Sequence, residues 1–167
     1  MERIFLIGYM GSGKTTIGKM LAARLGYSFV DMDAHIEQSQ FKTVSQIFNE
    51  IGEAEFRKLE QKCLHEVAEF HNAVISTGGG APCFFDNIEF MNSNGFTVYL
   101  KLTPTELAAR LQFSKANKRP LIANKTGEEL LTFVADGLAK RESYYNQAAL
   151  HINGTEEEIV NGICKFL

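Results

Sequence analysis

The chain has 167 residues, a length that suits one domain with its own buried core. Apolar residues make up 45% and charged residues 22%, as in ordinary globular proteins, and the formal net charge is −3. This balance argues against general binding to nucleic acid or to a membrane surface, which usually needs a basic excess. Any anion-binding site must therefore come from a local cluster of Arg and Lys.

Neither the cysteines nor the start of the chain indicates a special environment. Cys63, Cys83 and Cys164 are scattered and odd in number, without C-x-x-C spacing, so no disulfide framework or zinc site is predicted. The N-terminus enters a predicted strand almost at once, with no long apolar segment and no cleavage site, so we expect a cytoplasmic location and no membrane contact. Without a strong apolar surface signal, we expect a monomer.

The first predicted strand, residues 3–7, leads into Gly-Tyr-Met-Gly-Ser-Gly-Lys-Thr at positions 8–15. This is a complete G-x-x-x-x-G-K-[ST] phosphate-binding loop, and a predicted helix from Lys14, ended by Gly26, follows it. Backbone N–H groups of such a loop converge on one anion, Lys14 would reach the β- and γ-phosphates, and the Thr15 hydroxyl would hold Mg²⁺. The sequence therefore predicts a nucleoside triphosphate site, with contacts from Gly11, Ser12, Gly13, Lys14, Thr15 and Thr16.

A second strand is predicted over residues 27–30, with Asp31 and Asp33 directly at its end. Residues 43–46 fit a capping box for a short helix closing near position 52, and a longer helix is predicted over 53–70. On that longer helix, Arg57 shares a face with Glu53 and Glu60. Spacing alone favours a solvated Glu53–Arg57 ion pair.

The remaining elements continue the alternation of strand and helix. Strands are predicted over 73–76, 96–102 and 149–152, and helices over 103–113, 128–147 and 155–167. Residues 114–124 are polar and basic without a helical or strand period, which predicts a mobile loop. The pattern is typical of a single α/β domain spanning 1–167, with a doubly wound, five-stranded parallel sheet and right-handed crossovers.

Ligands of such sheets bind outside the carboxyl ends of the strands, where three motifs fall. They are the phosphate-binding loop, the Asp31/Asp33 pair and a run of three glycines at 78–80. Two carboxylates facing a phosphate loop suit a metal-linked role for one and a hydroxyl-binding role for the other. The alternative is that either Asp merely caps the following helix. The glycines would let backbone N–H groups approach a ligand closely.

Two absences narrow the class of enzyme. No apolar strand ends in the magnesium-binding Asp of many P-loop enzymes. Residues 124–127 lack the Asp of a guanine-reading loop and follow no strand, so a GTPase switch is not expected. Small size and a basic mobile loop favour a small-molecule kinase that closes a lid, residues 114–124, over its nucleotide.

An ordered set of motifs resembles the shikimate kinases over nearly the whole chain. The set is Asp31-x-Asp33, Phe56-Arg57-x-x-Glu60, Gly78-Gly79-Gly80-Ala81, Arg119-Pro120-Leu121 and Arg141-x-x-x-Tyr145. The resemblance implies a P-loop kinase that uses ATP and Mg²⁺ to phosphorylate the 3-hydroxyl of shikimate, in the pathway to chorismate and aromatic amino acids.

The resemblance also implies roles for individual residues. Asp33 would contact the shikimate hydroxyls, Arg57 and Arg141 would grip its carboxylate, and Gly78, Gly79 and Gly80 would line its site, with Gly79 donating from the backbone. Arg119 of the lid would reach the nucleotide phosphates, and Thr15 would ligate Mg²⁺ with Asp31 behind it. Lys14, Asp33 and Arg119 would be the catalytic residues. The pocket would be lined by Phe48, Phe56 and Glu60.

Alternatives remain. The same fold serves gluconate and nucleoside-monophosphate kinases, and a nucleotide-binding module without catalysis is a further possibility. The sequence departs from the family pattern between Arg110 and Arg119 and at 152–155, so contacts to adenine are not assigned.

Overall fold

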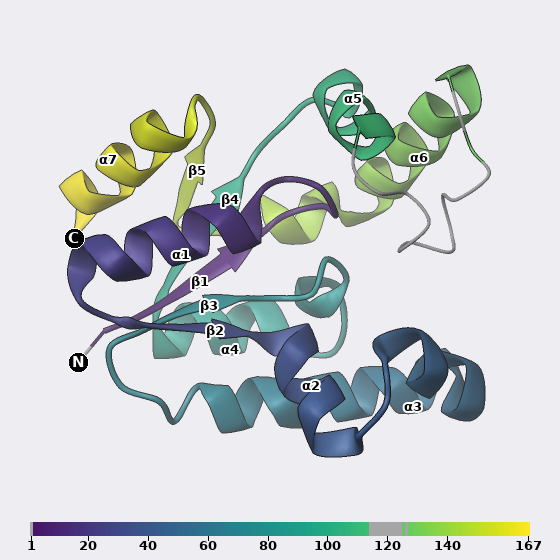
Figure 1. Cartoon of the computed structure of the whole chain (residues 1–167), viewed down its shortest axis with the longest axis horizontal. Coiled ribbons are helices and arrows are strands. Elements are labelled where there is room, and N and C mark those ends of the chain that lie inside the picture. The colour runs from purple at the N-terminus through teal and green to yellow at the C-terminus, as the bar shows by residue number, and fades with distance from the viewer. Residues whose placement is uncertain (1, 114–124, 126) are drawn as a thin grey trace.

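The computed structural model describes residues 2–113, 125 and 127–167. Its five strands form one parallel sheet in the order β2-β3-β1-β4-β5 (Figure 1). The strands are β1 (Arg3–Ile7), β2 (Ser28–Asp31), β3 (Ala73–Ser76), β4 (Phe96–Leu100) and β5 (Leu150–Ile152). The helices are α1 (Lys14–Leu25), α2 (Met32–Gln40), α3 (Val44–Val67), η1 (Ala81–Cys83), α4 (Asn87–Asn94), α5 (Pro104–Phe113), α6 (Gly127–Tyr145) and α7 (Glu156–Phe166). The predicted five-stranded parallel α/β sheet is confirmed.

The central strand β1 explains how the two faces of the sheet are covered. Its side chains alternate, so Ile4 and Leu6 join an apolar cluster with α1 and α7. Phe5 and Ile7 join the larger cluster on the other face, to which α2, α3, α4, α5 and α6 contribute. All four side chains are fully buried, as expected for a parallel strand covered on both sides. The carboxyl end of β1 is therefore held rigidly where the phosphate-binding loop begins.

Several helix ends follow directly from local sequence. The Thr103 hydroxyl accepts from the Glu106 N–H at 3.2 Å, and the Glu106 carboxylate accepts from the Thr103 N–H at 3.1 Å. This reciprocal capping starts α5. Thr155 caps α7 in the same way, and α1 ends at Gly26, as predicted.

The two helices predicted on either side of position 52 form α3, which is kinked at Gly52 (φ 80°, ψ 171°). A positive φ is tolerated by glycine at little steric cost, so this residue can change the direction of the helix. The kink separates a first segment carrying Phe48 from a second carrying Arg57. Both segments can then face one pocket.

Two α-helices, α2 and α4, and the short 3₁₀ helix η1 were not among the predicted elements. α2 buries only Met32 and Ile36, and α4 buries Asn87, Ile88 and Met91, so neither has a long apolar period to detect. Strand and helix ends elsewhere differ from the predicted ones by up to three residues. The predicted lid, residues 114–124, lies outside the described residues.

The structure also bears on the predictions made for the cysteines and for membrane contact. All three cysteines are free thiols, and only Cys63 is buried. No helix among the described residues has both the length and the apolarity needed to cross a membrane.

Candidate active site

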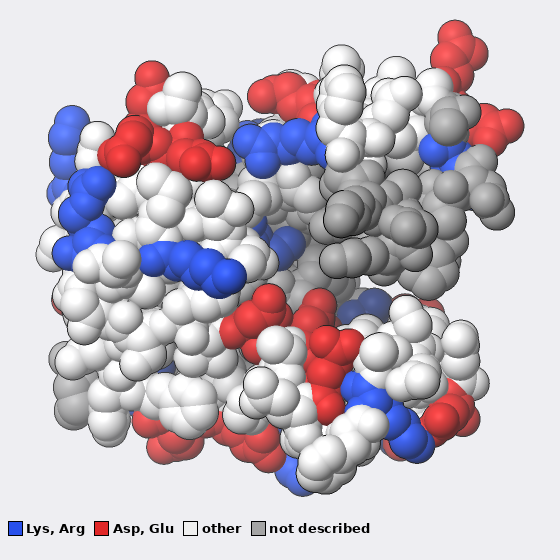
Figure 2. Space-filling view, in the orientation of Figure 1, with Lys and Arg blue, Asp and Glu red and all other residues white. Residues whose placement is uncertain are grey.

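The loop between β1 and α1 borders a pocket of about 320 Å³ at the carboxyl edge of the sheet. In the space-filling view the surface is hollowed between α1 and α2, with acidic side chains on the α2 side (Figure 2). Every residue predicted to contact the nucleotide within the loop lines this pocket: Gly11, Ser12, Gly13, Lys14, Thr15 and Thr16. The other lining residues are Met10, Asp31, Asp33, Ser76, Thr77, Gly78 and Gly79.

The loop is prepared for an anion by its backbone. The N–H groups of Gly11, Gly13 and Thr15 have no acceptor within the described residues, and those around Gly13 open the first turn of α1. The positive end of the helix dipole lies at the same place. The Lys14 ammonium folds back over the loop and donates to the carbonyls of Gly8 at 2.5 Å and Tyr9 at 3.2 Å. The pocket thus combines backbone donors with the Lys14 cation.

The C-terminal half of α5 closes one side of this loop. A guanidinium nitrogen of Arg110 lies 3.1 Å from where a side chain on Gly13 would begin, and Leu111 lies 2.8 Å from the same point on Gly11. The structure therefore places Arg110 beside the phosphate-binding loop. Sequence reasoning left its role open because the chain departs from the family pattern directly after it.

Asp31 and Asp33 stand at the end of β2 and in the first turn of α2, and both line the phosphate pocket. Asp31 caps α2, since one of its oxygens accepts from the Ala34 N–H at 3.2 Å. The capping interpretation is thus correct for Asp31. The same residue also lines the pocket, so capping does not exclude a role there. Solvent reaches Asp33 through the pocket, but the surrounding protein still desolvates its carboxylate. This desolvation, with the negative charge of Asp31, raises the pKa of Asp33 above the ordinary 3.8, against the opposing charge of Lys14.

A second pocket of about 300 Å³ adjoins the first. It contains all the residues predicted to bind the second substrate: Asp33, Arg57, Gly78, Gly79, Gly80 and Arg141, with Phe48, Phe56 and Glu60. Met10, Val44, Ser45 and Asn49 also line it and were not predicted. Ser45 and Asn49 lie in the first segment of α3, before the kink at Gly52. Nothing in the sequence indicated that this segment turns toward the pocket, because its direction depends on the kink.

The environment of Arg57 differs from the solvated pair that spacing favoured. Its side chain is only 11% exposed and donates to the Glu60 carboxylate at 2.9 Å, while Glu53 lies farther away at 3.6 Å. Its guanidinium also stacks on the ring of Phe84 at 4.3 Å, an interaction between residues far apart in sequence. The solvated interpretation was wrong because tertiary packing, which helical spacing does not encode, covers this face of α3. Burial raises the pKa of Glu60, against the opposing charge of Arg57.

The three glycines allow charged side chains to come very close to the backbone. Both terminal nitrogens of Arg57 lie 2.7 Å from where a side chain on Gly80 would begin. A carboxylate oxygen of Glu60 lies 2.8 Å from the corresponding point on Gly78. Any larger residue would displace these groups. The N–H groups of Gly78, Gly79 and Gly80 have no acceptor among the described residues, which leaves three donors beside the pocket.

Arg141 reaches the pocket from the last turns of α6. One of its nitrogens lies 3.3 Å from where a side chain on Gly79 would begin, and its guanidinium lies 5.4 Å from the ring centroid of Tyr9. Arg57 and Arg141 are 84 positions apart in the sequence (141 − 57). The fold brings both cations to one pocket.

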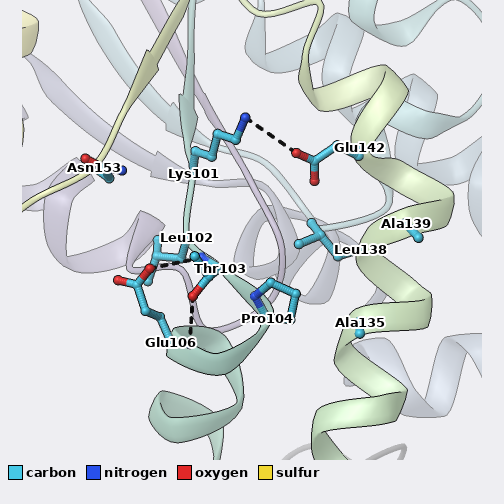
Figure 3. A pocket seen from close by; sticks show the side chains of 10 residues that line it. All are labelled: Lys101, Leu102, Thr103, Pro104, Glu106, Ala135, Leu138, Ala139, Glu142 and Asn153. Atoms are coloured by element: carbon cyan, nitrogen blue, oxygen red, sulfur yellow. Dashed lines mark hydrogen bonds and ion pairs between the residues drawn. The ribbon is translucent and has the colours of Figure 1, made fainter.

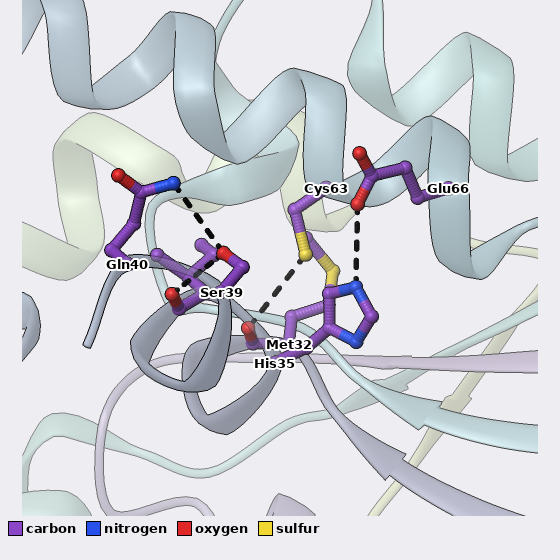
Figure 4. A network of polar contacts seen from close by, with 7 residues as sticks. Met32, His35, Ser39, Gln40, Cys63 and Glu66 are labelled. Atoms are coloured by element: carbon purple, nitrogen blue, oxygen red, sulfur yellow. Dashed lines mark hydrogen bonds and ion pairs between the residues drawn. The ribbon is translucent and has the colours of Figure 1, made fainter.

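Polar contacts join α2, which carries Asp33, to α3, which carries Arg57; Figure 4 shows these contacts. The Cys63 thiol donates to the Met32 carbonyl at 3.7 Å, and His35 contacts the Glu66 carboxylate at 3.3 Å. Met32 is fully buried beneath these contacts. The helix carrying the acidic pair is thus tied to the helix carrying the arginine.

The two pockets share a wall. Met10, Asp33, Gly78 and Gly79 line both of them. A group bound in the second pocket would therefore lie next to a phosphate bound in the first, with Asp33 beside both. Arg119, the remaining predicted catalytic residue, lies outside the described residues.

Comparison with known proteins identifies the family. The family model described as shikimate kinase matches residues 10–167. A shikimate kinase of Parabacteroides distasonis is 51% identical over the full length of both chains. The chain belongs to the shikimate kinase family. It is accordingly a kinase, a transferase that uses ATP.

Solved structures agree with this assignment. A shikimate kinase from Bacteroides thetaiotaomicron has a TM-score of 0.95 and 48% identity, covering 99% of this chain and 97% of that one. The enzyme from Acinetobacter baumannii, solved in complex with shikimate, has a TM-score of 0.88 and 32% identity, with coverage of 99% and 92%. A gluconokinase from Sinorhizobium meliloti shares only the fold, with a TM-score of 0.56 and 16% identity over 96% and 87%.

Proposed function

We propose that this chain transfers the γ-phosphate of ATP to the 3-hydroxyl of shikimate, on the route to chorismate and the aromatic amino acids. Family membership supports the reaction, and one observation supports the assignment of the pockets. Asp33 stands on the wall shared by the phosphate pocket and the arginine-lined pocket. A hydroxyl held beside it would face the terminal phosphate.

The second pocket suits a small carboxylate with several hydroxyls. A planar carboxylate matches the forked guanidinium of arginine, and Arg57 and Arg141 would fix its direction from two sides. Arg57 is already oriented by Glu60 and Phe84, so little side-chain freedom would be lost on binding. The free N–H groups of the glycine run and the rings of Phe48 and Phe56 would complete the contacts.

Asp33 would orient the attacking hydroxyl and accept its proton. A general base is most useful when its pKa lies closer to the working pH, and burial moves Asp33 in that direction. The opposing charges of Lys14 and Arg57 limit this shift. The ionised carboxylate of Asp33 would be the form that accepts the proton of the hydroxyl.

The phosphate pocket would neutralise the charge that is transferred. Lys14 would leave the loop carbonyls for the β- and γ-phosphates, and the free loop N–H groups would hold the same oxygens. Donors fixed before the reaction cost no reorganisation at the moment of transfer. Arg119 would add a further positive charge from the lid.

Thr15 and Asp31 fit a Mg²⁺ ion, because both place oxygen donors on the wall of the phosphate pocket. Among the described residues there is no group of three or more His, Cys, Asp or Glu that could hold a metal alone. This agrees with magnesium chemistry, since the ion keeps water and substrate phosphates as ligands. When bound, Mg²⁺ would neutralise charge on the β- and γ-phosphates.

The alternatives differ in the acceptor. Gluconate also carries a carboxylate and hydroxyls, and a nucleoside monophosphate also offers an anion to paired arginines. ADP release should be measured for the purified chain with ATP, Mg²⁺ and each of shikimate, gluconate and a panel of nucleoside monophosphates. We expect kcat/KM for shikimate to exceed the others by at least about a hundredfold. Comparable turnover of gluconate would change the assigned acceptor, and no turnover with any acceptor would indicate a nucleotide-binding module.

We also propose that residues 1–167 act as one cytoplasmic domain and as a monomer. A single continuous sheet with one apolar cluster on each face supports the single domain. Sedimentation velocity at assay concentrations tests the monomer directly. A dimer at those concentrations would contradict it.

A further inference from the structure

The last residue of α6, Tyr145, is fully buried, yet its hydroxyl lies beside the acceptor pocket. It donates to the Gly79 carbonyl at 2.5 Å. The Arg141 guanidinium, four residues earlier on the helix, lies close enough to interact with the same hydroxyl. One buried oxygen therefore contacts the glycine run and lies beside one of the two pocket arginines.

The hydrogen bond from Tyr145 to the Gly79 carbonyl also fixes the direction of the next N–H group, that of Gly80. A trans peptide is planar, so the Gly79 C=O and the Gly80 N–H point in opposite directions. Holding the carbonyl toward Tyr145 turns the Gly80 N–H away from it. That N–H has no acceptor within the described residues, and Gly80 lines the acceptor pocket. The free donor thus takes its direction from Tyr145.

The Arg141 side chain lies beside the same hydroxyl. Its guanidinium lies close to Gly79, 3.3 Å from where a side chain would begin, and has the Tyr9 ring on another side. Arg141 has no carboxylate partner in an ion pair among the described residues, in contrast to Arg57, which Glu60 holds. The Tyr145 oxygen is a buried acceptor near its head group. Burial raises the pKa of Tyr145, so the hydroxyl keeps the proton that it donates to Gly79.

We propose that Tyr145 is a positioning residue of the acceptor site, which aims the Gly80 N–H and the Arg141 guanidinium together at the acceptor carboxylate. This inference rests on the proposed function, because it assigns that carboxylate to the second pocket. Tyr145 itself touches neither substrate. Its effect should appear in acceptor binding rather than in nucleotide binding.

A neighbouring tyrosine provides a matched control. Tyr99 is 1% exposed and packs against Tyr145, with ring centroids 5.1 Å apart. Its hydroxyl lies 3.3 Å from the Glu142 carboxylate. Glu142 pairs with Lys101 at 3.7 Å in a surface groove that shares no lining residue with the two substrate pockets (Figure 3). Tyr99→Phe therefore removes the hydroxyl of an equally buried tyrosine, one that contacts Glu142 and not the glycine run.

The test compares Tyr145→Phe with Tyr99→Phe in steady-state assays with ATP and shikimate. We expect Tyr145→Phe to raise KM for shikimate about tenfold, because a buried carbonyl and a cation lose their shared partner, with KM for ATP unchanged. Tyr99→Phe should leave both KM values unchanged. Equal KM values for shikimate in the two variants, or a parallel rise of both KM values in Tyr145→Phe, would overturn the proposal.

A second measurement does not depend on the identity of the acceptor. The ¹⁵N–¹H resonance of Gly80 in the free protein should shift in Tyr145→Phe and stay in place in Tyr99→Phe. An unmoved resonance would overturn the proposal even if the wild type phosphorylates shikimate. Failure of the wild type to phosphorylate shikimate would instead contradict the proposed function. If Tyr145→Phe does not fold, 3-fluorotyrosine can be placed at position 145, because it keeps the ring and the hydroxyl but changes the strength of the donor. This variant must then change KM for shikimate and leave KM for ATP unchanged.

Discussion

The phosphate pocket and the acceptor pocket share a wall but are built in different ways. The phosphate pocket is made largely from one continuous stretch, residues 10–16, whose backbone N–H groups are its main donors. The acceptor pocket takes side chains from α2, α3 and α6 and the loop after β3. Its charged groups, from Asp33 to Arg141, are separated by most of the chain.

This difference indicates which part of the site can change independently. A backbone loop depends on its own local sequence and offers the same donors to any nucleoside triphosphate. An acceptor pocket made of distant side chains can be altered residue by residue without changing that loop.

The largest expected effect tests the phosphate pocket. Lys14→Ala should lower kcat by about a thousandfold or more, because the developing phosphate charge loses its nearest cation, while the loop backbone keeps its shape. Steady-state rates measure the loss of kcat, and a circular dichroism spectrum measures whether the fold is kept. Lys19→Ala makes the same change on the exposed side of α1 and should stay within about twofold of wild type. A Lys14→Ala rate within a few-fold of wild type would contradict the assignment.

Asp33 lies where the two pockets meet, so its substitution tests the boundary between them. Asp33→Asn keeps the shape and removes the charge, so kcat should fall by about a hundredfold or more while shikimate still binds. Stopped-flow rates with a shikimate titration separate the two effects. The exposed Asp136→Asn is the control. If the change appears only in the affinity for ATP, Asp33 belongs to the metal shell and the roles of Asp31 and Asp33 are exchanged.

A contrast between two arginines tests whether the pockets are energetically distinct. Arg57→Ala should raise KM for shikimate by about 10- to 100-fold with a smaller change in kcat, because it holds a carboxylate that does not react. Arg119→Ala should lower kcat more than it raises KM for shikimate, because the transferred phosphate needs its charge most in the transition state. Arg57→Lys retains the charge but loses the fork, so an intermediate KM is expected. If both alanine variants lose only shikimate affinity, Arg119 is an acceptor residue.

The smallest effect is a shift of the acid limb in the pH dependence of kcat/KM for shikimate. Burial first and the charge of Asp31 second raise the pKa of Asp33, so the limb should lie above the ordinary 3.8. The ionised form is the active one, so Asp31→Asn should lower this pKa and move the limb to lower pH. The ionisation of shikimate affects the wild type and Asp31→Asn equally, so it does not contribute to the difference between their limbs. A loss of Mg²⁺ affinity would lower kcat/KM at every pH and leave the position of the limb unchanged. A limb that stays in place or rises would show that Asp33 does not control it.

The sequence alone determined most of the phosphate pocket. Its loop is continuous, and the strand before it and the helix after it have strong local patterns, so neighbouring residues suffice to predict their arrangement. The order of strands and helices predicted the parallel sheet for a similar reason. The short, polar α2 and α4 were missed because they bury too few apolar residues to show a period.

Only the tertiary structure decided how the acceptor pocket is built. Helical spacing favoured a solvated Glu53–Arg57 pair, whereas packing against Phe84 and the glycine run buries Arg57 and turns it to Glu60. The family resemblance named Arg57 and Arg141 but could not show that the Tyr145 hydroxyl donates to the Gly79 carbonyl. This hydrogen bond joins residues 66 positions apart, and its geometry depends on how α6 packs over the sheet. Local sequence patterns carry no record of such packing, because each partner reads as an ordinary helix or loop residue by itself.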